Sequence, residues 1–370
     1  MVEVLLGTQA LEPRSYLVTV TEHLERLGHE VHVFSADPLP PPEELRVVGV
    51  ERELPLAPDV IYSQDAEAAL LLAHLYPLTP QLFAAHGDRD DVWLPPQLAG
   101  VVARVVVFDD RTGERVRAAA LPQQVVRLRR PVDLDRIVSR GELPERPAKA
   151  RLELDSVSDY RRGIVQRVLA DARIELDDDA DLVLGRGSVV VEALAEGRAV
   201  YVYGDDGGDG WVTPERYELL EADGFSGRAE PSATTFEHLR AELEGYDPAL
   251  GPASRELAQA HDARSHAQAL VAAFDDLEPR RDPVDAPLRE LARLVRVEAA
   301  SARRAYAHAR EAEVAATRAR ELERELAKAR ERNEQLMREV EELRLRADEA
   351  AALEEQRLER QKSRRFGPRR

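Results

Sequence analysis

The sequence contains no cysteine, few aromatic residues and no long apolar run. The absence of cysteine excludes disulfides, thiolate zinc sites and cysteine nucleophiles. No apolar segment reaches the roughly 18 residues that a membrane-spanning helix needs. The N-terminus has no basic segment followed by an apolar one, so we interpret MVEVLLG as a first buried strand and not as a signal peptide. We therefore expect a cytoplasmic protein.

Basic charge is also scarce. The formal net charge is −18, which argues against a nucleic acid as the partner of the whole chain. The C-terminus reverses this balance with Arg357, Arg360, Lys362, Arg364, Arg365, Arg369 and Arg370. Two interpretations stay open for this tail. It contacts an anionic surface, such as the inner face of a membrane or an acidic partner, or it is a solubilising end.

Residues 1–135 alternate between apolar runs and helical patterns. Strands are predicted at VEVLLG, VHVFSA, DVIYSQ, QLFAAHG and VARVVVFD, and SYLVTVTEHLERLG predicts a helix ended by Gly28. Apolar strands separated by helices favour a parallel sheet covered on both faces. RRPVDLDRI closes this domain, and we interpret its Pro131–Val132–Asp133 step as a hinge.

A second, smaller domain is predicted at 136–277. Its strands are expected at ARLELDS, ADLVLGRG and AVYVYGDD, and its first helices at RRGIVQRVLADA and SVVVEALAEG. Residues 234–277 are predicted to be helical, with breaks at Asp247–Pro248 and Gly251–Pro252. EPRRDPVDAP, at 278–287, is typical of a linker. The predicted fold class is α/β, with two Rossmann-like domains facing a cleft.

Residues 288–360 contain no proline or glycine and predict a long coiled coil, followed by the basic tail at 361–370. Apolar residues repeat in heptads, with Leu326, Asn333, Val340 and Ala347 at a, and with Leu322, Ala329, Leu336, Leu343 and Ala350 at d. A single asparagine at a, Asn333, favours two parallel strands in fixed register, so we predict a parallel homodimer. The alternative is a single solvated helix with many Glu–Arg pairs.

Two glycine segments could carry chemistry. Gly185–Arg186–Gly187 joins a predicted strand to a helix, where backbone N–H groups and the helix N-terminus favour a phosphate. Glu192 lies just over one turn into that helix, where its carboxylate can accept sugar or ribose hydroxyls. A second glycine loop, which includes Gly207 and Gly208, follows the next strand. Ordinary turns also use glycine, but the combination favours a nucleotide-sugar site at the sheet edge.

The segment LGRGSVVVEALAEGRAVYV resembles the GT-B glycosyltransferases of the family 4 type, which carry an E-x7-E motif here. Matching positions are Gly185, Gly187, Glu192, Ala193, Ala195 and Gly197. The resemblance implies that Glu192 holds the donor ribose. Leu184 stands at the place of the first glutamate. This departure leaves open a catalytically impaired glycosyltransferase-like binding or scaffold protein, assembled through its coiled coil.

The resemblance extends over about 1–277, through LERLGHEVHVFS, the stretch from DVIYSQ to HG, and RRPVDLDRI. It implies transfer of a sugar, of hexosyl type, from a nucleoside diphosphate sugar to a hydroxyl acceptor, with retention and without a metal or other cofactor. It places His86 near the transferred sugar as a catalytic residue, although a structural strand-end histidine is the other interpretation. Arg161 and Arg162 are candidates for gripping the donor diphosphate.

Two acidic runs could mimic metal sites, at Asp88–Asp91 and Asp177–Asp179. We interpret both as solvated or capping residues. A different enzyme with two Rossmann-like domains, such as an epimerase of sugar nucleotides, is a further alternative.

Overall fold

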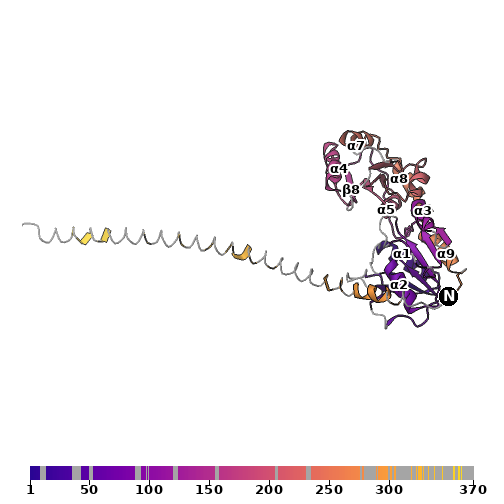
Figure 1. Cartoon of the computed structure of the whole chain (residues 1–370). Helices are drawn as coiled ribbons and strands as arrows, with labels where there is room; N and C mark the ends of the chain where they lie inside the picture. Colours follow the sequence, from indigo (N-terminus) through magenta and orange to yellow (C-terminus); the bar gives the residue numbers. More distant parts are fainter. Residues whose placement is uncertain are drawn as a thin grey trace, which may run out of the picture. The chain divides into compact units, whose positions relative to one another are not determined.

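The computed structural model describes residues 1–8, 14–35, 43–49, 53–87, 93–96, 98, 100–119, 124–154, 158–204, 207–230, 235–275, 277–278, 289, 291–298 and isolated positions between 301 and 360. The chain divides into two compact units, Met1–Arg303 and Arg304–Arg370. The first unit contains two sheets with their helices (Figure 1). We call them, with the helices that cover them, the first and second lobes.

The first lobe is built on a seven-stranded sheet. Its elements are β1 (Glu3–Thr8), α1 (Arg14–Arg26), β2 (Glu30–Ser35), β3 (Val47–Val48), β4 (Val60–Ser63), α2 (Ala66–Leu75), β5 (Gln81–Ala85), β6 (Arg104–Val107), α3 (Asp110–Ala118) and β7 (Gln124–Arg127). The strand order is β3-β2-β1-β4-β5-β6-β7, and every pairing is parallel. The five strands and the helix predicted from sequence are confirmed.

The inner strands are apolar because both faces of the sheet are covered. Every residue of β4, β5 and β6 is buried. Asp65 and Asp109 end the strand-to-helix turns and cap α2 and α3, accepting hydrogen bonds from Ala68 N at 2.7 Å and Thr112 N at 2.6 Å. These caps fix where the helices leave the carboxyl edge of the sheet.

The second lobe has a five-stranded sheet in the order β12-β11-β10-β8-β9. Its elements are β8 (Lys149–Leu152), α4 (Asp159–Asp171), β9 (Glu175–Leu176), β10 (Leu182–Gly185), α5 (Ser188–Ala195), β11 (Ala199–Tyr203), β12 (Gly208–Trp211), α6 (Tyr217–Ala222), α7 (Phe236–Leu243), α8 (Leu250–Leu257) and the short 3-10 helix η3 (Ala258–His261). The chain then continues into α9 (Ala263–Asp275). The three predicted strands and the helices α4 and α5 are confirmed.

Two local predictions in this lobe are wrong. Residues 208–211 form β12, antiparallel to β11, where a glycine loop was predicted. No break occurs at Gly251–Pro252, because both residues lie in the first turn of α8. A proline is tolerated there, since the first N–H groups of a helix have no partner within it.

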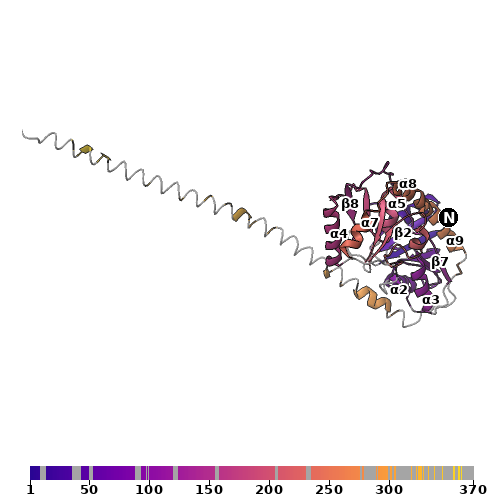
Figure 2. The same ribbon diagram turned by 90° about the horizontal axis from the view of Figure 1, so that it is seen from above.

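The end of the globular unit returns to the first lobe. Leu270 and Phe274 of α9 pack in one core cluster with Leu17, Val20 and Tyr62. Figures 1 and 2 both show α9 on the side of the first lobe. The helical stretch at 291–298 follows the same course, since Ala292 and Val295 pack against that lobe. The domain boundaries at 135, 277 and 287 stay predictions.

The chain crosses between the lobes twice, and the two crossings are bonded to each other. Val132 N donates to His261 O at 2.8 Å, and Ala263 N donates to Val132 O at 3.1 Å. The Pro131–Val132–Asp133 step therefore lies in a two-stranded crossing, where a hinge was predicted.

The described residues between 301 and 360 are helical. Asn333 and most of the predicted heptad positions lie outside the described residues, as do Asp88–Asp91. Among the parts of the chain that the structure describes, no helix is long and apolar enough to cross a bilayer.

Candidate functional site

Each sheet has one point at which the strand order reverses. In the first lobe this point lies between β1 and β4, and in the second between β8 and β10. Crevices outside the carboxyl ends of the strands at such points are where parallel sheets bind ligands. The predicted glycine turn and His86 can be placed relative to these two edges.

Gly185–Arg186–Gly187 lies at the reversal point of the second sheet. Gly185 ends β10, and a Cβ there would come within 3.3 Å of Glu153 Cβ on the neighbouring chain segment. Gly187 has φ 63° and ψ −131° and directly precedes α5. Such a backbone conformation excludes a side chain, so glycine is required. Gly187 N donates to Phe225 O at 2.9 Å, and Val190 N in the first turn of α5 donates to Gly187 O at 3.2 Å. Ser188 and Val189 precede the first backbone bonds within the helix, so their N–H groups are the ones suited to an anion.

Glu192 lies one turn into α5 and meets the first lobe. Its partly buried carboxylate accepts a hydrogen bond from Ser15, near the start of α1. Burial raises the pKa of Glu192, while Ser15 and the Arg151 guanidinium oppose this shift. Leu184, at the place of the motif's first glutamate, is a fully buried residue of β10.

Arg161 and Arg162 occupy the first turn of α4 but differ in their contacts. Arg162 Nη2 donates to Leu154 O at 2.8 Å. Arg161 Nη1 is buried and has no hydrogen-bond partner among the described residues. The same holds for the hydroxyl of Tyr203, a residue only 1% exposed at the end of β11. Burial raises the pKa of Tyr203, and the nearby Arg161 opposes this shift. Unsatisfied buried polar groups are costly, so this pair fits a ligand that would complete their bonds.

The second predicted glycine segment has a steric role in the fold. A Cβ on Gly208 would come within 2.8 Å of the Tyr201 ring. Gly207 has φ 142° and its carbonyl accepts from Gly204 N at 2.8 Å, closing the turn between β11 and β12. Arg186 lies partly buried between its two glycines.

His86 follows β5 at the carboxyl edge of the first sheet, among aromatic rings. It stacks on Phe108 with ring centres 5.1 Å apart and meets Tyr16 edge-on at 4.9 Å. Its Nε2 donates to Gln64 Oε1 at 2.7 Å, since the Gln64 amide is oriented by Tyr62 O. Burial, Arg130 and His266 hold the pKa of His86 well below its ordinary value, so the ring is neutral. Its Nδ1 is buried without a partner among the described residues.

Arg130 was not singled out in the sequence. Its Nη2 donates to His86 O at 2.6 Å, and its guanidinium lies 5.0 Å from the centre of the Phe108 ring. Burial lowers the pKa of Arg130, against the opposing effect of Asp109. A cation therefore stands beside His86, on the first crossing between the lobes.

Two further histidines hold this crossing and were not predicted. His261 Nδ1 donates to Arg130 O at 2.8 Å, and His266 Nδ1 donates to Arg129 O at 2.9 Å. The other nitrogen of each ring accepts from a tyrosine hydroxyl, Tyr217 in the second lobe and Tyr16 in the first. Burial lowers the pKa of both imidazoles to about 4. These contacts join residues over 40 positions apart, so no local pattern could have indicated them.

Ion pairs add a second connection between the lobes. Arg127 Nη2 lies 2.6 Å from Glu221 Oε2, and Arg111 Nη2 lies 2.8 Å from Asp223 Oδ1. Asp223 begins a turn whose Phe225 carbonyl accepts from Gly187 N. The turn that begins at Asp223 therefore connects the ion pair with Arg111 of the first lobe to the glycine turn at Gly187.

Comparison with solved structures decides the architecture. Anabaena Alr3699/HepE in complex with UDP-glucose matches with a TM-score of 0.52 and 13% identity, over 75% of this chain and 100% of that chain. Its complex with UDP and glucose matches with a TM-score of 0.50 and 10% identity over the same shares. These neighbours have the GT-B fold. The chain has the GT-B fold. No family model matches the sequence, and no curated protein matches it significantly.

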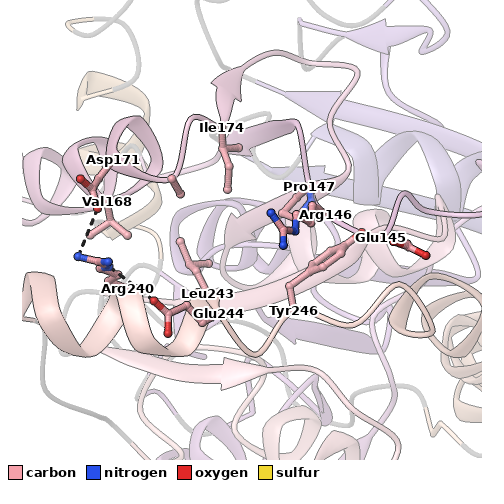
Figure 3. A pocket seen from close by; sticks show the side chains of 11 residues that line it. Glu145, Arg146, Pro147, Val168, Asp171, Ile174, Arg240, Leu243, Glu244 and Tyr246 are labelled. Carbon is pink, nitrogen blue, oxygen red and sulfur yellow. Dashed lines mark ion pairs between the residues drawn. The ribbon is translucent and has the colours of Figure 1, made fainter.

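A pocket of about 430 Å³ lies elsewhere in this GT-B chain (Figure 3). It is lined by Pro147, just before β8, by Ile174, just before β9, and by α4 and α7. It therefore opens at the amino edge of the second sheet, away from the glycine turn. Arg240 in its lining lies 3.6 Å from both Asp171 and Glu244, so its charge is already paired within the protein (Figure 3).

Among the described residues, one group of side chains could share a metal ion: Glu3, Glu30 and His32. Glu3 and Glu30 are the first residues of the paired strands β1 and β2, at the amino edge of the first sheet. His32 Nε2 lies 3.1 Å from Glu3 and 3.4 Å from Glu30. In a GT-B fold this edge faces away from the ligand side of the sheet.

Proposed function

We propose that this protein is a glycosyltransferase that moves a sugar from a nucleoside diphosphate sugar to a hydroxyl acceptor, with retention and without a metal. The observation that carries the proposal is the Gly185–Arg186–Gly187 turn at the reversal point of the second sheet, with Glu192 one turn into α5. The complex of a GT-B protein with UDP-glucose supports a nucleotide sugar as the ligand. Fold alone does not define an activity, so the site residues carry the argument.

The second lobe supplies groups suited to the donor. The Glu192 carboxylate would accept ribose hydroxyls in place of its bond to Ser15. The first-turn N–H groups of α5, with Arg186 and Arg161, would oppose the charge of the diphosphate as it leaves. Arg162, Gly207 and Gly208 remain predicted donor contacts.

The first lobe supplies the catalytic candidate. His86 is neutral, and its bond to Gln64 places the ring proton on Nε2, so Nδ1 carries a lone pair. It would orient a hydroxyl of the transferred sugar or acceptor, while Arg130 beside it favours developing negative charge. The neighbouring folds do not favour a catalytically impaired scaffold.

Calorimetric titration of the full chain with nucleotide sugars and free nucleotides tests the proposal. One nucleotide family should bind at micromolar strength. Glu192→Gln should weaken it about tenfold or more, because a charged acceptor becomes neutral. Glu196→Gln, at the end of the same helix, is the matched control and should bind normally. A folded wild-type protein that binds no member of the panel would refute the transferase assignment.

A further inference from the structure

The helical stretch at 291–298 has two different faces. Ala292 and Val295 are 0% and 7% exposed and pack against the first lobe. Leu291, Leu294 and Val297 form the adjoining face and are 39%, 49% and 52% exposed. Large aliphatic side chains repeated along one helix face indicate a surface that packs against another helix.

The heptad frame of the downstream segment can be counted back to this stretch, through a and d positions occupied by Glu298, Ser301, Ala305, His308, Ala312, Ala315 and Ala319. Counting back from Leu326 in sevens places Leu291 at a, and counting back from Leu322 places Leu294 at d. Ala292 and Val295 then fall at b and e. In this heptad frame the positions packed on the first lobe are therefore different from those of the a/d seam, which is the face formed by the a and d positions. Leu322 and Leu326 themselves are 49% and 51% exposed, as a seam without its partner would be.

The charges beside the seam complement a second copy of the same chain. In a parallel pair, each g residue faces the e residue five positions later on the partner helix. The charged g–e combinations are Arg318 with Glu323, Glu325 with Arg330, and Glu339 with Arg344. All three are attractive, and from 318 to 358 no like charges meet in this arrangement.

We propose that a second copy of this chain covers the seam as a parallel, in-register coiled coil that begins at Leu291, against the first lobe. The helix that anchors each globular unit through Ala292 and Val295 is then also the first part of the dimer interface. The proposal does not rest on the glycosyltransferase assignment.

Charge exchange in the full chain tests the identity of the partner. The variant Glu325→Arg/Glu339→Arg carries only arginine at the two pairs, and Arg330→Glu/Arg344→Glu carries only glutamate. Each should dimerise at least about tenfold more weakly than wild type, because attractive pairs become repulsive. An equimolar mixture should regain wild-type dimerisation, because each variant complements the other. Sedimentation velocity measures all three samples.

A second pair of variants tests where the seam begins. Leu291→Ser/Leu294→Ser should weaken dimerisation while leaving the thermal unfolding of the globular unit unchanged, because both side chains are exposed in the single chain. Val138→Ser removes an 86% exposed valine far from the seam in sequence and should change neither. Three results would each overturn the proposal. The wild type could be monomeric, the two charge variants could dimerise as strongly as wild type when measured separately, or their mixture could stay monomeric. Unchanged dimerisation of the leucine variant would overturn the start at Leu291.

Discussion

The carboxyl edges of the two sheets are built from opposite kinds of residue. In the first lobe, the rings of Tyr16, Tyr62, His86 and Phe108 fill this edge and contact one another. In the second lobe, Gly185, Gly187, Gly204 and Gly207 bring backbone to the corresponding edge. Rings make a rigid wall with fixed hydrogen bonds, whereas glycines let a ligand approach backbone N–H groups. The same architecture thus provides a rigid aromatic edge in the first lobe and, in the second, an edge where a ligand can approach the backbone.

The largest expected effect concerns the histidines that tie both lobes to the crossing. His261 and His266 have pKa values of about 4, below their ordinary value of 6.5. Between these values the unfolded chain binds protons that the folded chain does not, so their stabilisation is full above about pH 6.5 and is lost as the pH falls. From about pH 7 to about pH 5, each histidine should cost roughly 2 kcal/mol of unfolding free energy. Urea unfolding at both pH values measures this loss.

Single variants separate the two lobes in that experiment. His266→Gln removes the titrating group bonded to Tyr16, and His261→Gln removes the one bonded to Tyr217. Each should reduce the loss between the two pH values by roughly 2 kcal/mol, the share of one histidine, since glutamine does not titrate. Equal pH dependence in the wild type and both variants would contradict the assigned role.

A glycine from each lobe sharpens the comparison. Gly187→Ala and Gly28→Ala both place a side chain at positive φ, at 63° and 87°, and each should cost about 1–3 kcal/mol of stability. Only Gly187→Ala should also weaken nucleotide binding, because Gly187 shapes the turn before α5. Calorimetry and thermal unfolding of both variants provide the two measurements. Equal nucleotide affinity in Gly187→Ala and Gly28→Ala would show that the glycine turn before α5 is not the nucleotide-binding site.

The two adjacent arginines of α4 form a matched pair. Arg162→Met loses the bond to Leu154 O and should lower the unfolding free energy by about 1 kcal/mol. Arg161→Met removes a cation whose Nη1 has no partner among the described residues, so stability should hold while nucleotide affinity falls about tenfold. The reverse pattern would exchange the roles of the two residues.

The smallest expected effect is that of Tyr203→Phe. Removing a buried hydroxyl without a partner should leave the free protein as stable or raise its stability by up to about 1 kcal/mol. Nucleotide binding should weaken a few-fold if the hydroxyl completes its bond with the ligand. A clear loss of stability in the absence of nucleotide would mean that the hydroxyl is satisfied within the folded chain.

Local patterns predicted the strands with continuous apolar runs, because burial on both faces leaves little choice of residue. They failed for β12, because its two glycines, Gly208 and Gly210, are typical of a loop. In the structure these glycines lie in a strand and make room for the side chains of Tyr201 and Arg216. The break predicted at Gly251–Pro252 failed because proline at the start of a helix resembles proline after its end.

The site was predictable only where its residues are neighbours in sequence. The strand–glycine–helix pattern around Gly185–Gly187 placed that turn at the sheet edge. Arg130, His261 and His266 gave no signal, since their partners are distant in sequence and are joined by the lobe crossing. Likewise, nothing in DYRRGI distinguishes Arg161 from Arg162, because the difference depends on where Leu154 O lies.

The return of α9 to the first lobe has a consequence for synthesis on the ribosome. The core around Leu17 and Tyr62 also needs Leu270 and Phe274, and Leu5 and Ile61 pack with Ala292 and Val295. The N-terminal sheet therefore leaves the exit tunnel long before the residues that cover it have been translated. Domains usually fold in order from the N-terminus, but here β8 to β12 and the helices α4 to α8 of the second lobe are translated before α9, which the first lobe needs. We expect the nascent first lobe to expose apolar surface until translation is nearly finished, and to be the part that needs a chaperone.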